Sequence, residues 1–176
     1  MKIFGKIDLY NEEKGDIMGK IISLVNQKGG VGKTTTSINL SASLAVLGKK
    51  ILLIDLDPQG NATTGVGFNK GDIERSVYEV FNGSCEIEDA ILNTKFKNLS
   101  ILPSSLQLAG IDIELLEKGR EDPNFQKGYQ LKGQIEKIKE VFDYVIIVCP
   151  PSLGLITTIA LSASDSVIIP VQCEFF

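Results

Sequence analysis

A glycine-rich run lies where an apolar strand pattern gives way to a helical one, and it constrains the fold more than any other feature. The run N-Q-K-G-G-V-G-K-T-T occupies residues 26–35, directly after the β-branched segment Ile21–Val25. Apolar residues then recur at helical spacing from Ile38 to Leu47 and stop at Gly48. A strand, a glycine-rich loop and a helix in this order are the context of a phosphate-binding loop in an α/β fold.

The loop residues supply the groups that bind the phosphates of a nucleotide. Without a Cβ, glycines can take positive φ and turn backbone N–H groups toward an anion. The helix that follows directs its unpaired N–H groups and its dipole at the same point. Lys33 adds a mobile charge for the β- and γ-phosphates, and the Thr34 hydroxyl suits a Mg²⁺ ligand. The residues predicted to bind ATP are Lys28, Gly29, Gly30, Val31, Gly32, Lys33, Thr34 and Thr35.

Two aspartates follow the next apolar run. Residues 51–54 predict a buried parallel strand, which Asp55, Asp57 and a Pro-Gln-Gly turn follow. Ligands of parallel sheets bind at the carboxyl ends of the strands, so both aspartates are expected near the phosphates. The alternative for Asp57 is a turn residue before Pro58. Asp55 is equally consistent with a site role and a structural one.

Composition excludes several classes of function. The chain has 176 residues, 43% of them apolar, which predicts one globular domain with a core and no membrane span. A net charge of −4 argues against a generally basic nucleic-acid binder but leaves a local basic patch open. The absence of histidine rules out histidine catalysis and histidine metal sites. The cysteines, Cys85, Cys149 and Cys173, form no C-x-x-C pair and are expected to be reduced thiols.

The remaining patterns predict further elements of an α/β sheet. We expect a loop from residue 65, helices near 76–81, 86–92, 106–118, 128–140 and 156–163, a loop at 119–124, and strands near 99–103, 141–148 and 165–173.

Three segments resemble one family. K-G-G-V-G-K-T-T, residues 28–35, resembles the deviant Walker A motif of the ParA/Soj/MinD ATPases, because Lys28 stands where the strict pattern has glycine. D-L-D-P-Q-G-N-A-T, residues 55–63, resembles switch I of ParA/Soj proteins. C-P-P-S-L-G, residues 149–154, resembles switch II. The later segment A-S-D-S-V-I-I-P-V-Q-C-E, residues 163–174, also resembles the family's sequence. The resemblance covers nearly all of residues 18–176. The segment at 55–63 favours the ParA/Soj proteins over MinD within this family.

The resemblance implies an α/β P-loop NTPase with a doubly wound, mostly parallel sheet. Residues 18–176 would form the N-terminal two-thirds of the ATPase domain, with its C-terminal part missing, and residues 1–17 an extension outside it. Met18 would be the natural start of translation. An uncovered sheet edge at the end of such a piece predicts aggregation.

The family's activity implies roles for individual residues. Catalysis would involve Lys28, Lys33 and Asp57: Lys28 would reach the nucleotide of the other subunit, and Asp57 would orient the attacking water. Thr34 and Asp57 would hold Mg²⁺. An ATP-dependent homodimer would bind DNA non-specifically through regions absent here, and a ParB-like partner would stimulate hydrolysis. The protein would be cytoplasmic and nucleoid-associated, taking part in chromosome or plasmid partitioning.

One position departs from the family pattern. The family has an aspartate directly before C-P-P, where this chain has Val148, and a valine accepts no hydrogen bond from a Mg²⁺-bound water. A lost charged hydrogen bond is worth roughly 1.5–3 kcal/mol. A catalytically impaired nucleotide-binding fragment is therefore one alternative. A MinD-like membrane-cycling ATPase is another, which would need a C-terminal amphipathic helix in the missing region.

Overall fold

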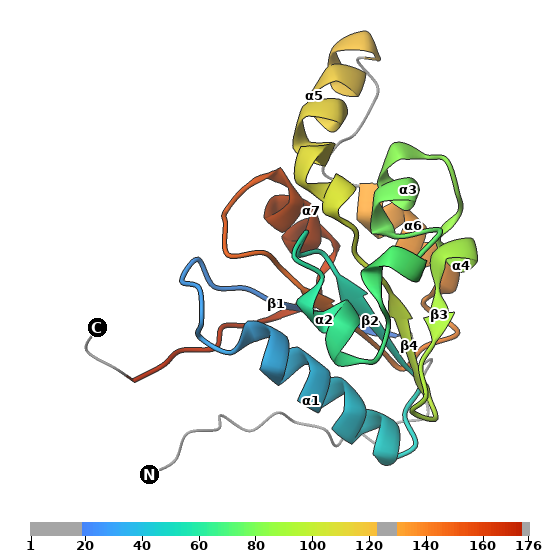
Figure 1. Ribbon diagram of the computed structural model, residues 1–176, viewed down its shortest axis with the longest axis vertical. Helices are drawn as coiled ribbons and strands as arrows, with labels where there is room; N and C mark the ends of the chain where they lie inside the picture. Colours follow the sequence, from blue (N-terminus) through green and yellow to red (C-terminus); the bar gives the residue numbers. More distant parts are fainter. Residues whose placement is uncertain (1–18, 123–129, 174–176) are drawn as a thin grey trace.

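The computed structural model describes residues 19–122 and 130–173, and it has a central six-stranded sheet (Figure 1). The strand order is β3-β4-β2-β5-β1-β6, and every pairing is parallel except β3–β4. The strands are β1 (Lys20–Leu24), β2 (Ile51–Asp55), β3 (Leu92–Asn93), β4 (Leu99–Leu102), β5 (Tyr144–Val148) and β6 (Ser166–Ile168). The predicted α/β class with a mostly parallel sheet is confirmed. The expectations for residues 1–17 and for Met18 lie outside the described residues.

Helices cover both faces of this sheet (Figure 1). They are α1 (Lys33–Val46), α2 (Asn61–Gly65), α3 (Val77–Asn82), α4 (Ile87–Ala90), α5 (Ile111–Glu121), α6 (Gln130–Ile138) and α7 (Leu155–Ala163), with the short 3₁₀ helices η1 (Lys70–Asp72) and η2 (Leu106–Gly110).

The strands build two cores because their side chains alternate between the faces. Leu53 of β2 and Ile146 of β5 are buried against α1 and α2. Their neighbours Ile54 and Ile147 belong to the larger core, to which α3, α4, α5, α6 and α7 contribute. Continuous apolar strands such as Ile51–Ile54 are thus explained by burial on both faces.

Several predicted boundaries are wrong, each for a physical reason. The helix expected at 86–92 ends at Ala90, and Leu92–Asn93 form β3, since a short apolar run suits either state. Helix α2 was not predicted, because contacts distant in sequence support it. Strand β6 is shorter than expected, since Pro170 lacks the N–H that would continue its ladder.

The topology gathers the functional segments at one edge of the sheet. Strands β1, β2 and β5 are adjacent, so the loops that follow them, residues 25–32, 56–60 and 149–154, emerge side by side. Strand β6 lies at one edge of the described sheet, where its own Val167 and the following Ile169 are exposed. That exposure agrees with the expected aggregation, which stays a prediction.

Candidate functional site

The glycine-rich loop between β1 and α1 has the backbone geometry of an anion cradle. Gly30 has φ 76° and Gly32 has φ 90°, values that side chains with a Cβ adopt only under strain. Gly32 is the residue before α1, so the loop leads directly into the helix N-terminus. Gly29 does not have positive φ, although the sequence suggested it for all three glycines.

Two side chains hold the loop in shape from within. The Lys33 ammonium is buried and donates hydrogen bonds to the carbonyls of Asn26, at 2.8 Å, and Lys28, at 3.1 Å. Asn26 Oδ1 accepts a hydrogen bond from the Lys28 N–H at 2.9 Å. Asn26 Nδ2 donates to the Pro170 carbonyl at 2.8 Å, which ties the loop to the segment after β6. The loop is therefore preorganised by its own residues.

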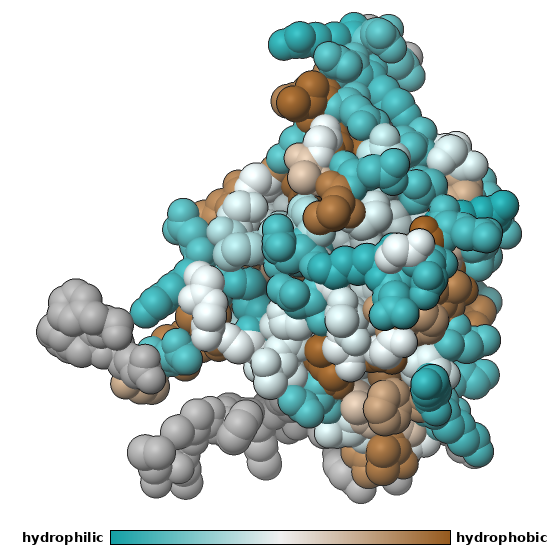
Figure 2. Space-filling model, in the orientation of Figure 1, coloured by the Kyte–Doolittle hydropathy of each residue, from teal (hydrophilic) through white to brown (hydrophobic). Residues whose placement is uncertain are grey.

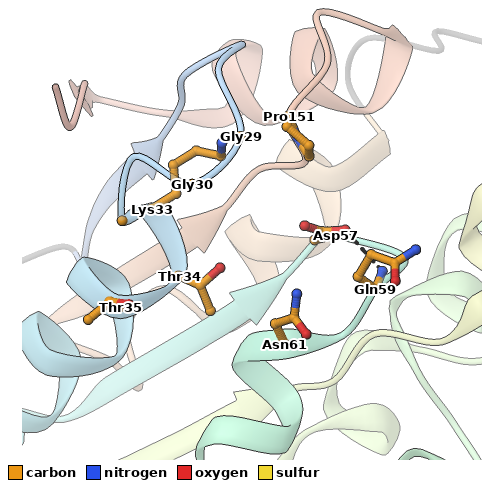
Figure 3. Close-up of a pocket in the computed structure, with 10 residues that line it drawn as sticks. Gly29, Gly30, Lys33, Thr34, Thr35, Asp57, Gln59, Asn61 and Pro151 are labelled. Atoms are coloured by element: carbon orange, nitrogen blue, oxygen red, sulfur yellow. Dashed lines mark hydrogen bonds between the residues drawn. The ribbon is translucent and has the colours of Figure 1, made fainter. Parts of the chain in front are cut away.

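A cavity of about 360 Å³ lies in front of this loop. Figure 3 shows Thr34 and the loop on one side and Asp57, Gln59 and Asn61 on the other, with Pro151 above them. The lining residues are Gly29, Gly30, Gly32, Lys33, Thr34, Thr35, Asp57, Gln59, Asn61 and Pro151. A hydroxyl and a carboxylate oxygen facing one cavity are hard-oxygen ligands of the kind that Mg²⁺ takes, so the residues fit that ion.

Asp57 is held in place at the cavity wall. Its Oδ1 accepts a hydrogen bond from the Gln59 N–H at 2.9 Å, and its main-chain carbonyl accepts one from the Ser104 hydroxyl at 2.7 Å. The Gly60 N–H donates to the same carbonyl at 2.8 Å. The side chain and the main-chain carbonyl of Asp57 therefore both fix the turn after β2.

Asp55 has a structural role instead. It does not line the cavity, and its Oδ2 accepts hydrogen bonds from the N–H and the hydroxyl of Thr63, both at 2.8 Å. Its Oδ1 accepts from the Asp57 N–H at 3.2 Å. Thr63 is in the first turn of α2, so this carboxylate satisfies a helix N–H in the way an N-cap side chain does. It connects β2 to α2 and to the Asp57 backbone.

Burial raises the pKa of Asp55 from 3.8 to about 6, although the hydrogen bonds from Thr63 and Asp57 oppose this. The folded state therefore binds the proton more tightly than the unfolded state does, and stability from this group falls as the pH rises.

We expect the free energy of unfolding to fall by about 3 kcal/mol between pH values of about 4 and 6 on account of Asp55. In Asp55→Asn this contribution is absent, because the side chain no longer titrates. Urea unfolding of both proteins across this pH range measures it. Parallel stability curves for the two proteins would contradict the assignment.

Val148 lies at the carboxyl end of β5, between Leu24 of β1 and Asp55 of β2 in register. It is 1% exposed and packs in the core beneath α1. Because paired residues of parallel strands face the same side, the Val148 and Asp55 side chains are neighbours on the α1 face. The apolar residue therefore stands where the switch II loop leaves the sheet toward the cavity.

The cysteines form no disulfide, as the sequence predicted. Burial raises the pKa of Cys149 to about 12, even with the Lys33 charge opposing this, so the thiol beside the site stays protonated. Within the described ranges no three acidic, histidine or cysteine side chains form a metal-binding group. Among the helices of residues 19–122 and 130–173, none combines the length and apolar composition that a bilayer-crossing segment needs.

The predicted site residues fall into two groups in the structure. Most of them line the cavity, but Lys28 is exposed outside it and the Val31 side chain is buried behind the loop. Sequence reasoning missed Gln59, Asn61 and Pro151 as lining residues. All three lie inside the segments at 55–63 and 149–154, so the resemblance of these segments to switch I and switch II could have identified them as lining residues.

The fold and this loop define the chain as a P-loop protein of the α/β class. A family model described as an AAA domain matches residues 19–176. The sporulation initiation inhibitor protein Soj of Bacillus subtilis (strain 168) is 53% identical over 159 residues, which cover 90% of this chain and 60% of that protein. The chain belongs to the ParA/Soj family within this domain class. The chain spans about 60% of the length of the curated relatives named for comparison.

Solved structures agree with this assignment. A cobyrinic acid a,c-diamide synthase from Mycobacterium smegmatis, with bound ATP analog and magnesium, has a TM-score of 0.82 at 40% identity, over 89% of this chain and 59% of that chain. An ATP complex of a McdA variant from Cyanothece has a TM-score of 0.80 at 27% identity, over 90% of this chain and 58% of that chain. Nucleotide and magnesium are thus bound by proteins of this fold.

Proposed function

We propose that the chain binds ATP with Mg²⁺ in the cavity between the glycine-rich loop and the turn after β2, and that it is part of a partitioning ATPase. The observation that carries this proposal is that Lys33, Thr34 and Asp57, from two different strand ends, line one cavity. Solved structures of similar proteins with a bound ATP analog or ATP support the nucleotide. Similarity to the chromosome partitioning protein ParA of Caulobacter vibrioides, 42% identical over 159 residues, supports the partitioning role.

The triphosphate would lie along the loop. An ammonium has three donor hydrogens, and Lys33 uses two of them on loop carbonyls. The third is available for a phosphate oxygen, together with the N–H groups at the start of α1. Because the ammonium is already fixed, little reorganisation is needed when the charge of the transferring phosphoryl group develops.

Asp57 and Thr34 face the same space from opposite sides (Figure 3). In the proposed reaction Asp57 orients the attacking water, and Thr34 and Asp57 hold Mg²⁺. The ion, when bound, neutralises phosphate charge. The bonds from Ser104 and Gly60 keep Asp57 at the cavity wall, so its position does not depend on the nucleotide.

The activity of the whole protein is part of the proposal. Lys28 is exposed beside the cavity, where it is free to reach the nucleotide of a second copy in an ATP-dependent homodimer. Non-specific DNA binding, stimulation by a ParB-like partner and a nucleoid location would belong to the longer protein. The second candidate is a catalytically impaired nucleotide binder, which the apolar Val148 favours.

The test is ATP hydrolysis and ATP binding by Asp57→Asn. We expect the rate of phosphate release to fall by about 100-fold or more, because the water loses its orienting carboxylate. ATP affinity should change by less than about five-fold, since the loop carries most of the binding. Asp72→Asn, at an exposed position in η1, is the control for loss of a surface carboxylate. Equal hydrolysis by Asp57→Asn and the parent chain would contradict the role of Asp57.

A further inference from the structure

An exposed apolar surface lies at the amino-terminal edge of the sheet, opposite the cavity. It comprises Val46, 86% exposed, Leu47, 74% exposed, and Phe96, 53% exposed. In Figure 2 hydrophobic side chains lie at the lower end of the molecule, where α1 ends in Figure 1. Exposed large apolar side chains on two segments that a hydrogen bond from Asn98 to the Ala45 carbonyl joins are candidates for an interaction surface.

Four exposed lysines stand next to these residues in the sequence: Lys49, Lys50, Lys95 and Lys97. The two segments that carry the surface, residues 46–50 and 94–98, contain no acidic residue, in a chain of net charge −4. Among the described residues, none of these four ammonium groups makes an ion pair or a side-chain hydrogen bond. We call the three apolar residues and the four lysines the lysine-ringed patch.

Hydrogen bonds join the two segments, one of them from the Asn98 side chain. Asn98 Nδ2 donates to the Ala45 carbonyl at 3.3 Å, and the Ile51 N–H donates to the Asn98 carbonyl at 2.8 Å. The turn between β3 and β4 is closed by Thr94, whose hydroxyl bonds the Leu99 carbonyl at 2.8 Å. The same hydroxyl accepts a hydrogen bond from the Phe96 N–H at 3.0 Å. Phe96 is thus presented outward by a preorganised turn.

The lysines are not needed to complete the end of α1. Its last carbonyls already accept hydrogen bonds from the N–H groups of Leu47, Gly48 and Lys49, and from Asn98. Lysines near a helix C-terminus often serve as such partners, but here backbone groups and an amide do so. The charges of Lys49, Lys95 and Lys97 are therefore available to an external anion, whereas the Asp143 carboxylate lies next to Lys50, whose N–H it accepts at 2.6 Å.

We propose that the lysine-ringed patch docks on the surface of an anionic lipid bilayer. Aliphatic and aromatic side chains insert at the boundary between headgroups and acyl chains, while surrounding lysines pair with lipid phosphates. Nucleic acid fits less well, because Val46 and Leu47 can neither stack on bases nor bond phosphates. A second copy of the same face would bring like charges together.

This surface lies at the opposite edge of the sheet from the glycine-rich loop, so docking does not require a nucleotide. The proposal is therefore independent of the proposed ATPase function. It also differs from a MinD-like C-terminal helix, because it uses residues of the central domain.

The test is co-sedimentation of the chain with vesicles of equal parts phosphatidylcholine and phosphatidylglycerol, without nucleotide. We expect binding that high salt weakens and that pure phosphatidylcholine vesicles do not support. Lys95→Gln/Lys97→Gln should lower the partition coefficient by about 25-fold, since each lysine near an anionic surface contributes about five-fold. Leu47→Ser/Phe96→Ser should lower it by at least about ten-fold through loss of inserted apolar area.

Ile113→Ser is the matched control, because Ile113 is 65% exposed on α5, at the other end of the molecule (Figure 1). It should leave vesicle binding unchanged, and unaltered melting temperatures should show that all variants fold. Absence of binding to anionic vesicles, or equal binding by the patch variants, would overturn the proposal. So would binding to duplex DNA that depends on Lys95 and Lys97 while vesicles are not bound.

Discussion

Replacing Val148 with aspartate should raise the rate of ATP hydrolysis by the chain by about 10- to 100-fold. The new carboxylate would stand at the end of β5, beside Asp55 in register and beneath α1. The family resemblance predicts that a carboxylate at this position would accept a hydrogen bond from a Mg²⁺-bound water, a charged interaction worth roughly 1.5–3 kcal/mol. Phosphate release at saturating ATP and Mg²⁺ measures the gain, and the Mg²⁺ concentration at half-maximal rate should fall.

The same substitution should destabilise the protein when Mg²⁺ and nucleotide are absent. Val148 is 1% exposed, so the aspartate would bury a second carboxylate next to Asp55, whose pKa burial already raises to about 6. We expect a loss of about 2–4 kcal/mol in the free energy of unfolding. Val148→Thr matches the shape of valine and adds only a neutral hydroxyl, so its gain in rate should be much smaller than that of Val148→Asp. Equal rates for Val148→Asp and Val148→Thr would refute the account of this position.

The second large effect is expected at Lys33. Lys33→Ala should lower the affinity for ATP with Mg²⁺ by about 100-fold or more, because the phosphates lose a charge that is fixed within the loop. The loop also loses its bonds to the Asn26 and Lys28 carbonyls. Fluorescence titration with a labelled ATP analogue measures the change, and a thermal melt monitors folding.

Lys28→Ala is the matched control for this experiment. Lys28 carries the same charge in the same loop, but its side chain is exposed and does not line the cavity. Binding by a single chain should therefore change by less than about five-fold, since exposed charges contribute little. Equal losses in the two variants would show that general loop charge, and not the buried ammonium, determines affinity.

Much of the fold follows from the sequence. The strands at Ile51–Asp55 and Tyr144–Val148 could be predicted because burial on both faces requires continuous apolar runs. Gly48, with φ 86°, ends the first helical segment where its position in the pattern indicated. These features depend on local composition, which a sequence displays directly.

The elements that could not be predicted depend on contacts distant in sequence. Helix α2 is short, and it is held by the Asp55 carboxylate, eight residues before Thr63, and by Ser104, whose N–H bonds the Thr63 hydroxyl at 3.0 Å. Strand β3 exists because Leu92 and Asn93 pair with β4. Propensity alone gives no reason for either element.

In the site, too, some features follow from the sequence and others depend on contacts distant in sequence. The place of the glycine-rich loop and of Asp57 at one edge of the sheet could be predicted, because both follow parallel strands that end at that edge. The structural role of Asp55 could not, since it depends on Thr63 approaching from α2. The buried position of Val31 and the place of Pro151 in the cavity wall likewise depend on how the loops pack.

A calorimetric titration of the chain with ATP and Mg²⁺ tests directly whether the cavity binds the nucleotide. The titration is repeated with ADP, and again after chelation of the metal. A cavity built from the Lys33 loop and the Asp57 turn predicts one saturable site per chain, shared by ATP and ADP and weakened when Mg²⁺ is removed. Heat that never saturates, or a site that Lys33→Ala leaves intact, would contradict it.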